Sequence, residues 1–293
     1  MFCRDLVRTC LSISLVSIGI SGFSTPASST TVIEFFGRNS CSSDVMVQDS
    51  LKNILQNEDD IIVINCRTWF DNKGSAKTFS HQFCNERHDI YTDKFRISNM
   101  FHSSPLIVNG RWDAFYKDIM PAVSISKTDK VEPISMEIHD NMLDVSIPDI
   151  KSEVGYGDII LFAYMPSQGG KTSLYVDADV SLTDDMREKL SKNQSVPFVK
   201  KVGADPYFIR PVLSMMNIGH WTGNKISMSV SLDELTSMAS SSAQDLSYVA
   251  VLHEGGKVGP VLAVGEIVSA KEYQNTLPKS VPQDIKYMSH KKL

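Results

Sequence analysis

The sequence lacks the patterns that identify many enzymes and membrane proteins. Its 293 residues contain one long apolar run without charges, at residues 11–20. Neither a Gly-x-Ser-x-Gly elbow nor a His-Glu-x-x-His zinc motif is present. The formal net charge is −5, so there is no broad basic surface for nucleic acid. These absences argue against a protein with several membrane helices, an elbow-type serine hydrolase, a zincin and a nucleic-acid-binding protein.

The single apolar run belongs to a predicted signal peptide, residues 1–27. Arg4 and Arg8 give a weakly basic start, the run at residues 11–20 follows, and small residues for cleavage end at Ala27. The run is too short and too rich in serine for a transmembrane helix. The alternative is an uncleaved N-terminal anchor. We expect an exported protein, periplasmic or fully secreted, with no membrane span after cleavage.

Cysteine is scarce, with five residues in the chain. Cys3 and Cys10 would leave with the signal peptide, so Cys41, Cys66 and Cys84 remain. An exported chain with three cysteines forms at most one internal disulfide. All three pairings stay open at this point.

The first half alternates predicted strands and helices. Residues 32–36 suit a buried strand, and a short polar turn ends at Cys41. A helix is predicted from Asp44, because apolar residues then recur on one helical face. Residues 61–64 form a second apolar run, which predicts a strand parallel to the first. Cys41 is the first candidate nucleophile, because a helix N-terminus favours the thiolate.

The remainder of the first half predicts a helix, a hairpin and another helix. The helical pattern covers residues 80–95. An apolar run at residues 105–108 is closed by Asn109-Gly110, a strong hairpin signal, with residues 111–115 as the return strand. A short helix near residues 116–125 would complete a domain of residues 30–126.

From about residue 131 the pattern changes to short apolar or alternating runs separated by turn residues. This spacing predicts an antiparallel sandwich over residues 131–270. The domain boundary is expected within residues 126–133. Residues 271–293 are polar and locally basic, which predicts a flexible tail.

Several motifs resemble one family. They are the strand and cysteine motif at residues 32–43, Trp69-Phe70-Asp71, the proline-led segment at residues 104–110, and the segments at residues 201–205 and 218–223. Together they resemble the secreted thioredoxin-like proteins of Gram-negative bacteria described as a domain of unknown function. The resemblance implies an α/β thioredoxin-like domain followed by an all-β sandwich-like domain. It also implies that Pro105 begins the third strand beside the reactive cysteine.

The chain departs from this family at its cysteine motif, which is degenerate. The sequence is Cys41-Ser42-Ser43-Asp44, where the family has a second cysteine at the last position. Cys66 and Thr68 replace the family's histidine and aspartate. Without a resolving thiol, the ordinary dithiol mechanism is not available. Asp44 is also expected to oppose a thiolate on Cys41.

Three hypotheses for Cys41 follow: a nucleophile acting alone, a redox pair with Cys66, or a remnant on a fold that only binds. The leading prediction is a non-enzymatic module that binds a protein or peptide outside the cytoplasm, beside Pro105. The alternative is thiol–disulfide oxidoreductase-like activity, in which Cys41 attacks, Cys66 resolves and Pro105 shapes the site. No cofactor is predicted.

A weak metal candidate lies in the second predicted helix. His81, Cys84 and His88 would share one helix face, and a thiol with two imidazoles suits zinc or copper. No fourth ligand is fixed by the spacing. The alternative interpretation is a half-exposed face on which Cys84 packs as a small apolar residue.

Overall fold

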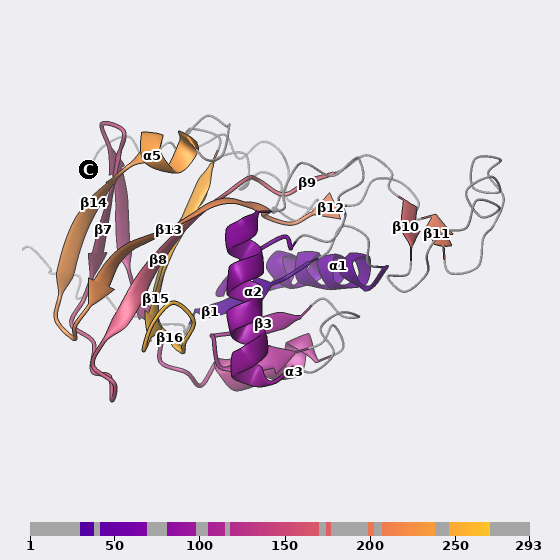
Figure 1. Ribbon diagram of the computed structural model, residues 1–293, viewed down its shortest axis with the longest axis horizontal. Coiled ribbons are helices and arrows are strands. Elements are labelled where there is room, and N and C mark those ends of the chain that lie inside the picture. Colours follow the sequence, from indigo (N-terminus) through magenta and orange to yellow (C-terminus); the bar gives the residue numbers. More distant parts are fainter. Residues whose placement is uncertain are drawn as a thin grey trace, which may run out of the picture.

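The computed structural model describes residues 30–37, 42–68, 81–97, 105–114, 118–169, 174–176, 199–201, 207–237 and 246–269. Within these residues it places sixteen strands and four helices. Three larger sheets form the body of the molecule (Figure 1). No helix in this part of the chain is both long and apolar enough to cross a membrane. The predicted signal peptide and the tail at residues 271–293 lie outside the described residues.

The first sheet has four strands: β1 (Thr31–Phe35), β2 (Ile61–Asn65), β3 (Leu106–Val108) and β4 (Trp112–Ala114). Their order is β2-β1-β3-β4, with β1 parallel to β2 and antiparallel to β3. The predicted hairpin at Asn109-Gly110 is confirmed by the pairing of β3 with β4. Both turn residues have positive φ, 48° and 62°, as the tight hairpin turn requires.

Three helices pack on this sheet: α1 (Ser42–Asn57), α2 (Gln82–Phe95) and α3 (Ile119–Ser126). Helices α1 and α3 cover one face, where Val47 and Leu51 contact the β1 residues Ile33 and Phe35. Helix α2 covers part of the other face. The helix and strand periods in the sequence therefore predicted these elements correctly.

The second sheet has five strands: β5 (Glu132–Pro133), β8 (Gly157–Tyr164), β13 (Val212–Trp221), β15 (Ser247–Glu254) and β16 (Val261–Ile267). Their order is β13-β8-β15-β16-β5. Nearly every residue of β8 and β15 is buried. This sheet therefore forms a central layer that is covered on both faces.

One face of the central sheet packs on a third sheet, made of β6 (Ser135–His139), β7 (Met142–Ile147) and β14 (Ile226–Ser231), and on the short helix α5 (Leu232–Ser237). The opposite face packs directly on the first sheet, where Val32 and Ile62 share a core with Phe162 and Val249. Two short pairs complete the described elements: β9 (Gln168–Gly169) with β12 (Tyr207–Phe208), and β10 (Leu174–Val176) with β11 (Val199–Lys201).

The predicted fold class, an α/β thioredoxin-like domain followed by an all-β sandwich-like domain, is wrong. The described chain is mostly β-structure, and its first sheet is not a separate α/β layer. Much of one face of that sheet is covered by the central β-sheet rather than by helices. The physical reason lies in strands such as β8, whose continuous apolar run is buried on both faces. From the sequence, such runs were predicted to form a separate sandwich domain.

Candidate functional site

A disulfide between Cys66 and Cys84 lies at the centre of the predicted site. Cys66 directly follows β2, Cys84 lies in the first turn of α2, and their α-carbons are 5.3 Å apart. Both residues are fully buried, in a cluster with Phe36, Tyr91 and Ile107. The structure thus selects one of the three pairings that the sequence left open.

This pairing corrects the redox hypothesis that joined Cys41 with Cys66. The sulfur of Cys66 is bonded to Cys84 instead, because α2 brings Cys84 against the end of β2. Cys41 itself lies outside the described residues.

Asp44, which stands where the resembled family has its second cysteine, forms a buried ion pair. Its Oδ2 accepts hydrogen bonds from Arg67 Nη1 at 2.6 Å and from Gln48 Nε2 at 2.9 Å. The side chains of Asp44 and Arg67 are both 0% exposed. A side chain at Gly37 would collide with both charged groups. The Arg67 guanidinium therefore compensates the charge that was expected to oppose a thiolate.

Pro105 lies where the sequence placed it, immediately before β3, and it is buried. Its carbonyl oxygen accepts the Phe36 N–H at 3.0 Å, and Cys66 N–H donates to Phe35 O at 2.8 Å. Pro105 and Cys66 thus meet at the carboxyl end of β1, close to the ion pair of Asp44. Of the predicted site residues, the described part of the chain thus brings together Cys66 and Pro105, and both are buried in structural contacts.

The metal candidate is not assembled in this state. Cys84 is bonded to Cys66, which leaves it no thiolate for a metal. His81 stacks on Phe83 with ring centroids 4.9 Å apart, and burial lowers the pKa of His81. His88 is buried and contacts Asp89 at 3.1 Å. Within the described residues, no group of three or more His, Cys, Asp and Glu is placed to hold a metal ion.

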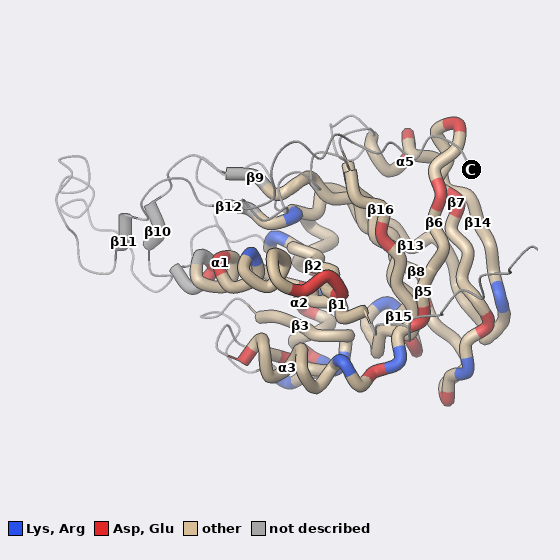
Figure 2. Tube along the Cα trace, turned by 180° about the vertical axis from the view of Figure 1, so that it is seen from behind, with Lys and Arg blue, Asp and Glu red and all other residues tan. Residues whose placement is uncertain are grey.

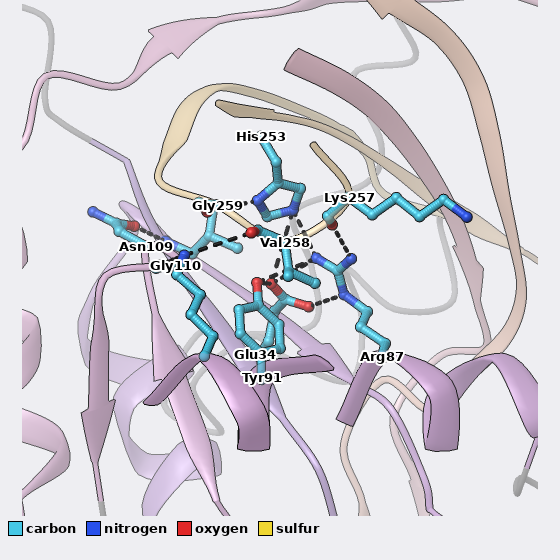
Figure 3. A network of polar contacts seen from close by, with 11 residues as sticks. Glu34, Arg87, Tyr91, Asn109, Gly110, His253, Lys257, Val258 and Gly259 are labelled. Atoms are coloured by element: carbon cyan, nitrogen blue, oxygen red, sulfur yellow. Dashed lines mark hydrogen bonds and ion pairs between the residues drawn. The ribbon is translucent and has the colours of Figure 1, made fainter. Parts of the chain in front are cut away.

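A second buried polar cluster, which was not predicted from the sequence, is formed by Glu34, Arg87, Tyr91 and His253 (Figure 3). Arg87 donates to both oxygens of Glu34, at 2.5 Å from Nε and 2.9 Å from Nη2. Tyr91 donates to Glu34 Oε1 at 2.5 Å. Arg87 Nη2 also lies 2.7 Å from His253 Nε2. These side chains come from β1, α2 and β15, so the cluster joins the first sheet to the central sheet.

The electrostatics of this cluster favour a fixed set of charges. Burial alone would raise the pKa of Glu34, but the charge and hydrogen bonds of Arg87 outweigh it and hold that pKa below its usual range. Burial, and then the charge of Glu34, raise the pKa of Tyr91. Burial first and Arg87 second lower the pKa of His253 to about 4. At neutral pH the cluster therefore holds one anion, one cation, a phenol and a neutral imidazole.

The sequence did contain a signal for this cluster. Glu34 interrupts the apolar strand Val32-Ile33-Glu34-Phe35, and His253 ends the apolar run of β15. A charged residue inside a buried run requires a partner, because an unpaired buried charge is costly. The sequence offers many cations, however, and does not identify Arg87 as the partner.

A polar depression lies on the outer face of the three-stranded sheet and has a volume of about 600 Å³. Its lining residues are Ser135, Glu137, Asp144, Val145, Ser146, Ser227, Met228 and Ser229. Glu137 stands directly opposite Asp144 across β6 and β7, and Asp144 faces Ser229 of β14. Elsewhere, acidic and basic residues are interspersed along the described trace (Figure 2). The depression is a surface at which a ligand could contact several hydroxyls and carboxylates.

Comparison with known proteins finds a similar fold but does not address the function. A crystal structure of an Agrobacterium tumefaciens protein, determined by a structural genomics consortium, matches with a TM-score of 0.59 and 12% identity. The match covers 83% of this chain and 96% of that one. No protein-family model and no curated protein matches the chain. The likeness therefore concerns the fold alone, and the resemblance to the secreted thioredoxin-like family stays a prediction.

Proposed function

We propose that the protein acts outside the cytoplasm as a non-enzymatic module that binds a protein or peptide. The observation that carries this proposal is the fully buried Cys66–Cys84 disulfide. A disulfide of this kind persists in an oxidising compartment, in agreement with the predicted export. Its burial leaves neither sulfur accessible to a substrate.

The charged groups near the disulfide support the same proposal. Asp44 and Arg67 neutralise each other in the interior, and the carbonyl of Pro105 is bonded within the chain. A nucleophilic site requires accessible groups with perturbed protonation. In the described residues, the positions predicted to be catalytic have structural contacts instead.

The binding surface that we propose is the polar depression between β6, β7 and β14. Glu137 and Asp144 are exposed there, and serine hydroxyls surround them. The groove beside Pro105 remains the prediction from the sequence. We prefer the depression because its carboxylates and hydroxyls are exposed, whereas Pro105 is buried. Charged and hydroxyl groups on an open surface suit a polar segment of another protein.

The reactivity of the cysteines tests the proposal that the protein is not a thiol enzyme. Differential alkylation with peptide mapping should label Cys66 and Cys84 only after reduction. In a Cys66→Ser/Cys84→Ser variant, Cys41 is the one remaining thiol of the predicted mature chain. We expect it to alkylate no faster than a cysteine in a simple peptide. Trapping of mixed disulfides with proteins on Cys41, lost in Cys41→Ser, would establish redox activity instead.

Charge reversal provides the test of the binding surface. Asp144→Lys should abolish the cross-links that the wild type forms with an exported protein. It should also weaken direct binding, measured once that protein has been purified. The matched control is Asp233→Lys, which makes the same charge change at an exposed residue of α5. Equal binding by the wild type and Asp144→Lys would exclude the depression as the binding surface.

A further inference from the structure

The turn between β15 and β16, residues 255–260, docks on the first sheet and on α2. Arg87 Nη1 donates to the carbonyl of Lys257, and Val261 N–H donates to Asn109 O at 2.9 Å. Lys94 Nζ lies 3.2 Å from Gly110 O and 3.5 Å from Val258 O. Figure 3 shows these polar contacts around the turn. Val258 of the turn also packs against the buried apolar cluster that contains the disulfide.

His253 is fully buried beneath this turn, and its partners determine its protonation state. The Arg87 guanidinium donates hydrogen bonds only, so His253 Nε2, at 2.7 Å, must accept. The carbonyl of Gly259 accepts only, so His253 Nδ1, at 2.9 Å, must donate. Both ring nitrogens are therefore satisfied in one neutral tautomer, with the proton on Nδ1.

We propose that His253 is an acid-sensitive latch that holds the β15–β16 turn against α2. Protonation places a hydrogen on Nε2, where it points at the Arg87 N–H group instead of accepting from it. The two cationic groups then repel each other within a buried cluster. Release of the turn brings the imidazolium into water and leaves Arg87 bound to Glu34. The latch does not depend on the proposed binding function.

Other charged groups near His253 modify this effect without reversing it. Glu34 Oε1 lies 3.9 Å from His253 Nε2 and favours the imidazolium, whereas Lys94 opposes it. Asp158 of β8 stands opposite His253 in the sheet and is bonded to His220 at 2.8 Å. The titratable and charged groups around the ring are Glu34 of β1, Arg87, Tyr91 and Lys94 of α2, Asp158 of β8, Glu254 at the end of β15, and Lys257 within the turn.

The direction of the pH effect follows from the pKa of His253. That pKa is about 4 in the closed state and returns to the ordinary value of 6.5 when the ring reaches water. The open state therefore binds more protons between these two values, so acid favours opening and the closed state gains stability as pH rises. The opening equilibrium constant should increase about 100-fold between pH 7 and pH 4.

Hydrogen exchange, corrected for the intrinsic rate at each pH, measures this opening directly. In the wild type, protection of the amides of Gly255 and Val261, which donate to Tyr156 O and Asn109 O at the two ends of the turn, should fall about 100-fold from pH 7 to pH 4. His253→Gln keeps an acceptor for Arg87 but does not titrate, so its protection should be nearly independent of pH. The matched control, His220→Gln, removes an exposed histidine and should behave like the wild type. Equal pH dependence in the wild type and His253→Gln would overturn the proposal.

A measurement on the unmodified protein covers the case in which His253→Gln does not fold. Nitrogen-15 NMR of the wild-type imidazole should show the Nδ1–H tautomer at pH 7. It should also show that the His253 imidazole titrates well below the ordinary histidine value of 6.5. An Nε2–H tautomer, or a midpoint at the ordinary histidine value, would overturn the latch.

Discussion

Helices α1 and α2 cover opposite faces of the first sheet, yet different forces hold them there. Helix α1 packs through the apolar residues Val47, Leu51 and Ile54. The buried residues of α2 are Cys84, Arg87, His88 and Tyr91. The first helix is thus held largely by apolar packing, with one buried ion pair, Asp44–Arg67, at its first turn. The second is held by a disulfide and a buried network of charges and hydrogen bonds.

This difference has an energetic consequence. A buried apolar side chain contributes to stability through the area it removes from water and needs no single partner, whereas a buried charge contributes only while its partner is present. Glu34, which lies 53 residues before Arg87, is therefore as important for α2 as any residue within the helix. Substitutions in the two helices should separate these cases.

The largest effect is expected from Arg87→Met. This change leaves the Glu34 carboxylate buried without the guanidinium that donates to both of its oxygens. We expect a loss of about 3–5 kcal/mol in the free energy of unfolding, measured by urea denaturation. The matched control is Arg111→Met, whose side chain is 41% exposed and pairs loosely with Asp129. The control should cost less than about 1 kcal/mol. Equal losses in the two variants would show that the buried pair of Arg87 and Glu34 contributes no more to stability than the exposed pair of Arg111 and Asp129.

Leu51→Ala makes the corresponding change in α1. The side chain is fully buried, and its truncation leaves a cavity between the helix and the sheet. We expect a loss of about 3 kcal/mol in the same denaturation experiment. Met46→Ala on the exposed face of α1 should change stability by less than about 0.5 kcal/mol. A small effect at Leu51 would contradict the apolar account of α1.

The contrast between the helices also explains how far the sequence predicts the structure. The apolar spacing after Asp44 predicted α1, and the Asn109-Gly110 turn predicted the β3–β4 hairpin. Both predictions were correct because each signal lies within the element itself. Packing of β8 between two other sheets is a long-range event, and a continuous apolar run does not say which surfaces will cover it. The fold class was therefore wrong although its first elements were right.

The candidate site shows the same limit. Cys66 and Pro105 were expected near one end of the first sheet, and the structure places them there. The choice of Cys84 as the disulfide partner depends on where α2 docks, and three cysteines allow three pairings. The sequence gives His253 no visible connection to Arg87, 166 residues earlier in the chain.

Removal of the disulfide should reduce the local stability of α2 more than that of α1. The replacement Cys66→Ala/Cys84→Ala opens a link between residues that are 18 positions apart. It should lower the free energy of unfolding by about 2–3 kcal/mol. Hydrogen exchange should show a greater loss of protection in residues 84–95 than in residues 44–57. Equal loss in both helices would mean that the disulfide stabilises the whole fold rather than the position of α2.

The smallest effect concerns one hydroxyl of the network. Tyr91→Phe removes the hydrogen bond to Glu34 and should cost about 1.5–2 kcal/mol at neutral pH. Burial, and then the charge of Glu34, raise the pKa of Tyr91 above its ordinary value of 10.0, so its stabilisation is complete below pH 10. It is lost at higher pH, as the phenol ionises in the unfolded chain.

The wild type should therefore lose stability above pH 10 more steeply than Tyr91→Phe. The raised pKa of Tyr248, about 12, contributes equally to both proteins and cancels in their difference. Urea denaturation between pH 8 and pH 11 measures that difference. The control is Tyr156→Phe, at a tyrosine that is 45% exposed, and it should follow the wild-type curve. Parallel curves for the wild type and Tyr91→Phe would mean that the pKa of Tyr91 is not raised in the folded protein, and the phenol would then add nothing to the network of Glu34 and Arg87 that holds α2.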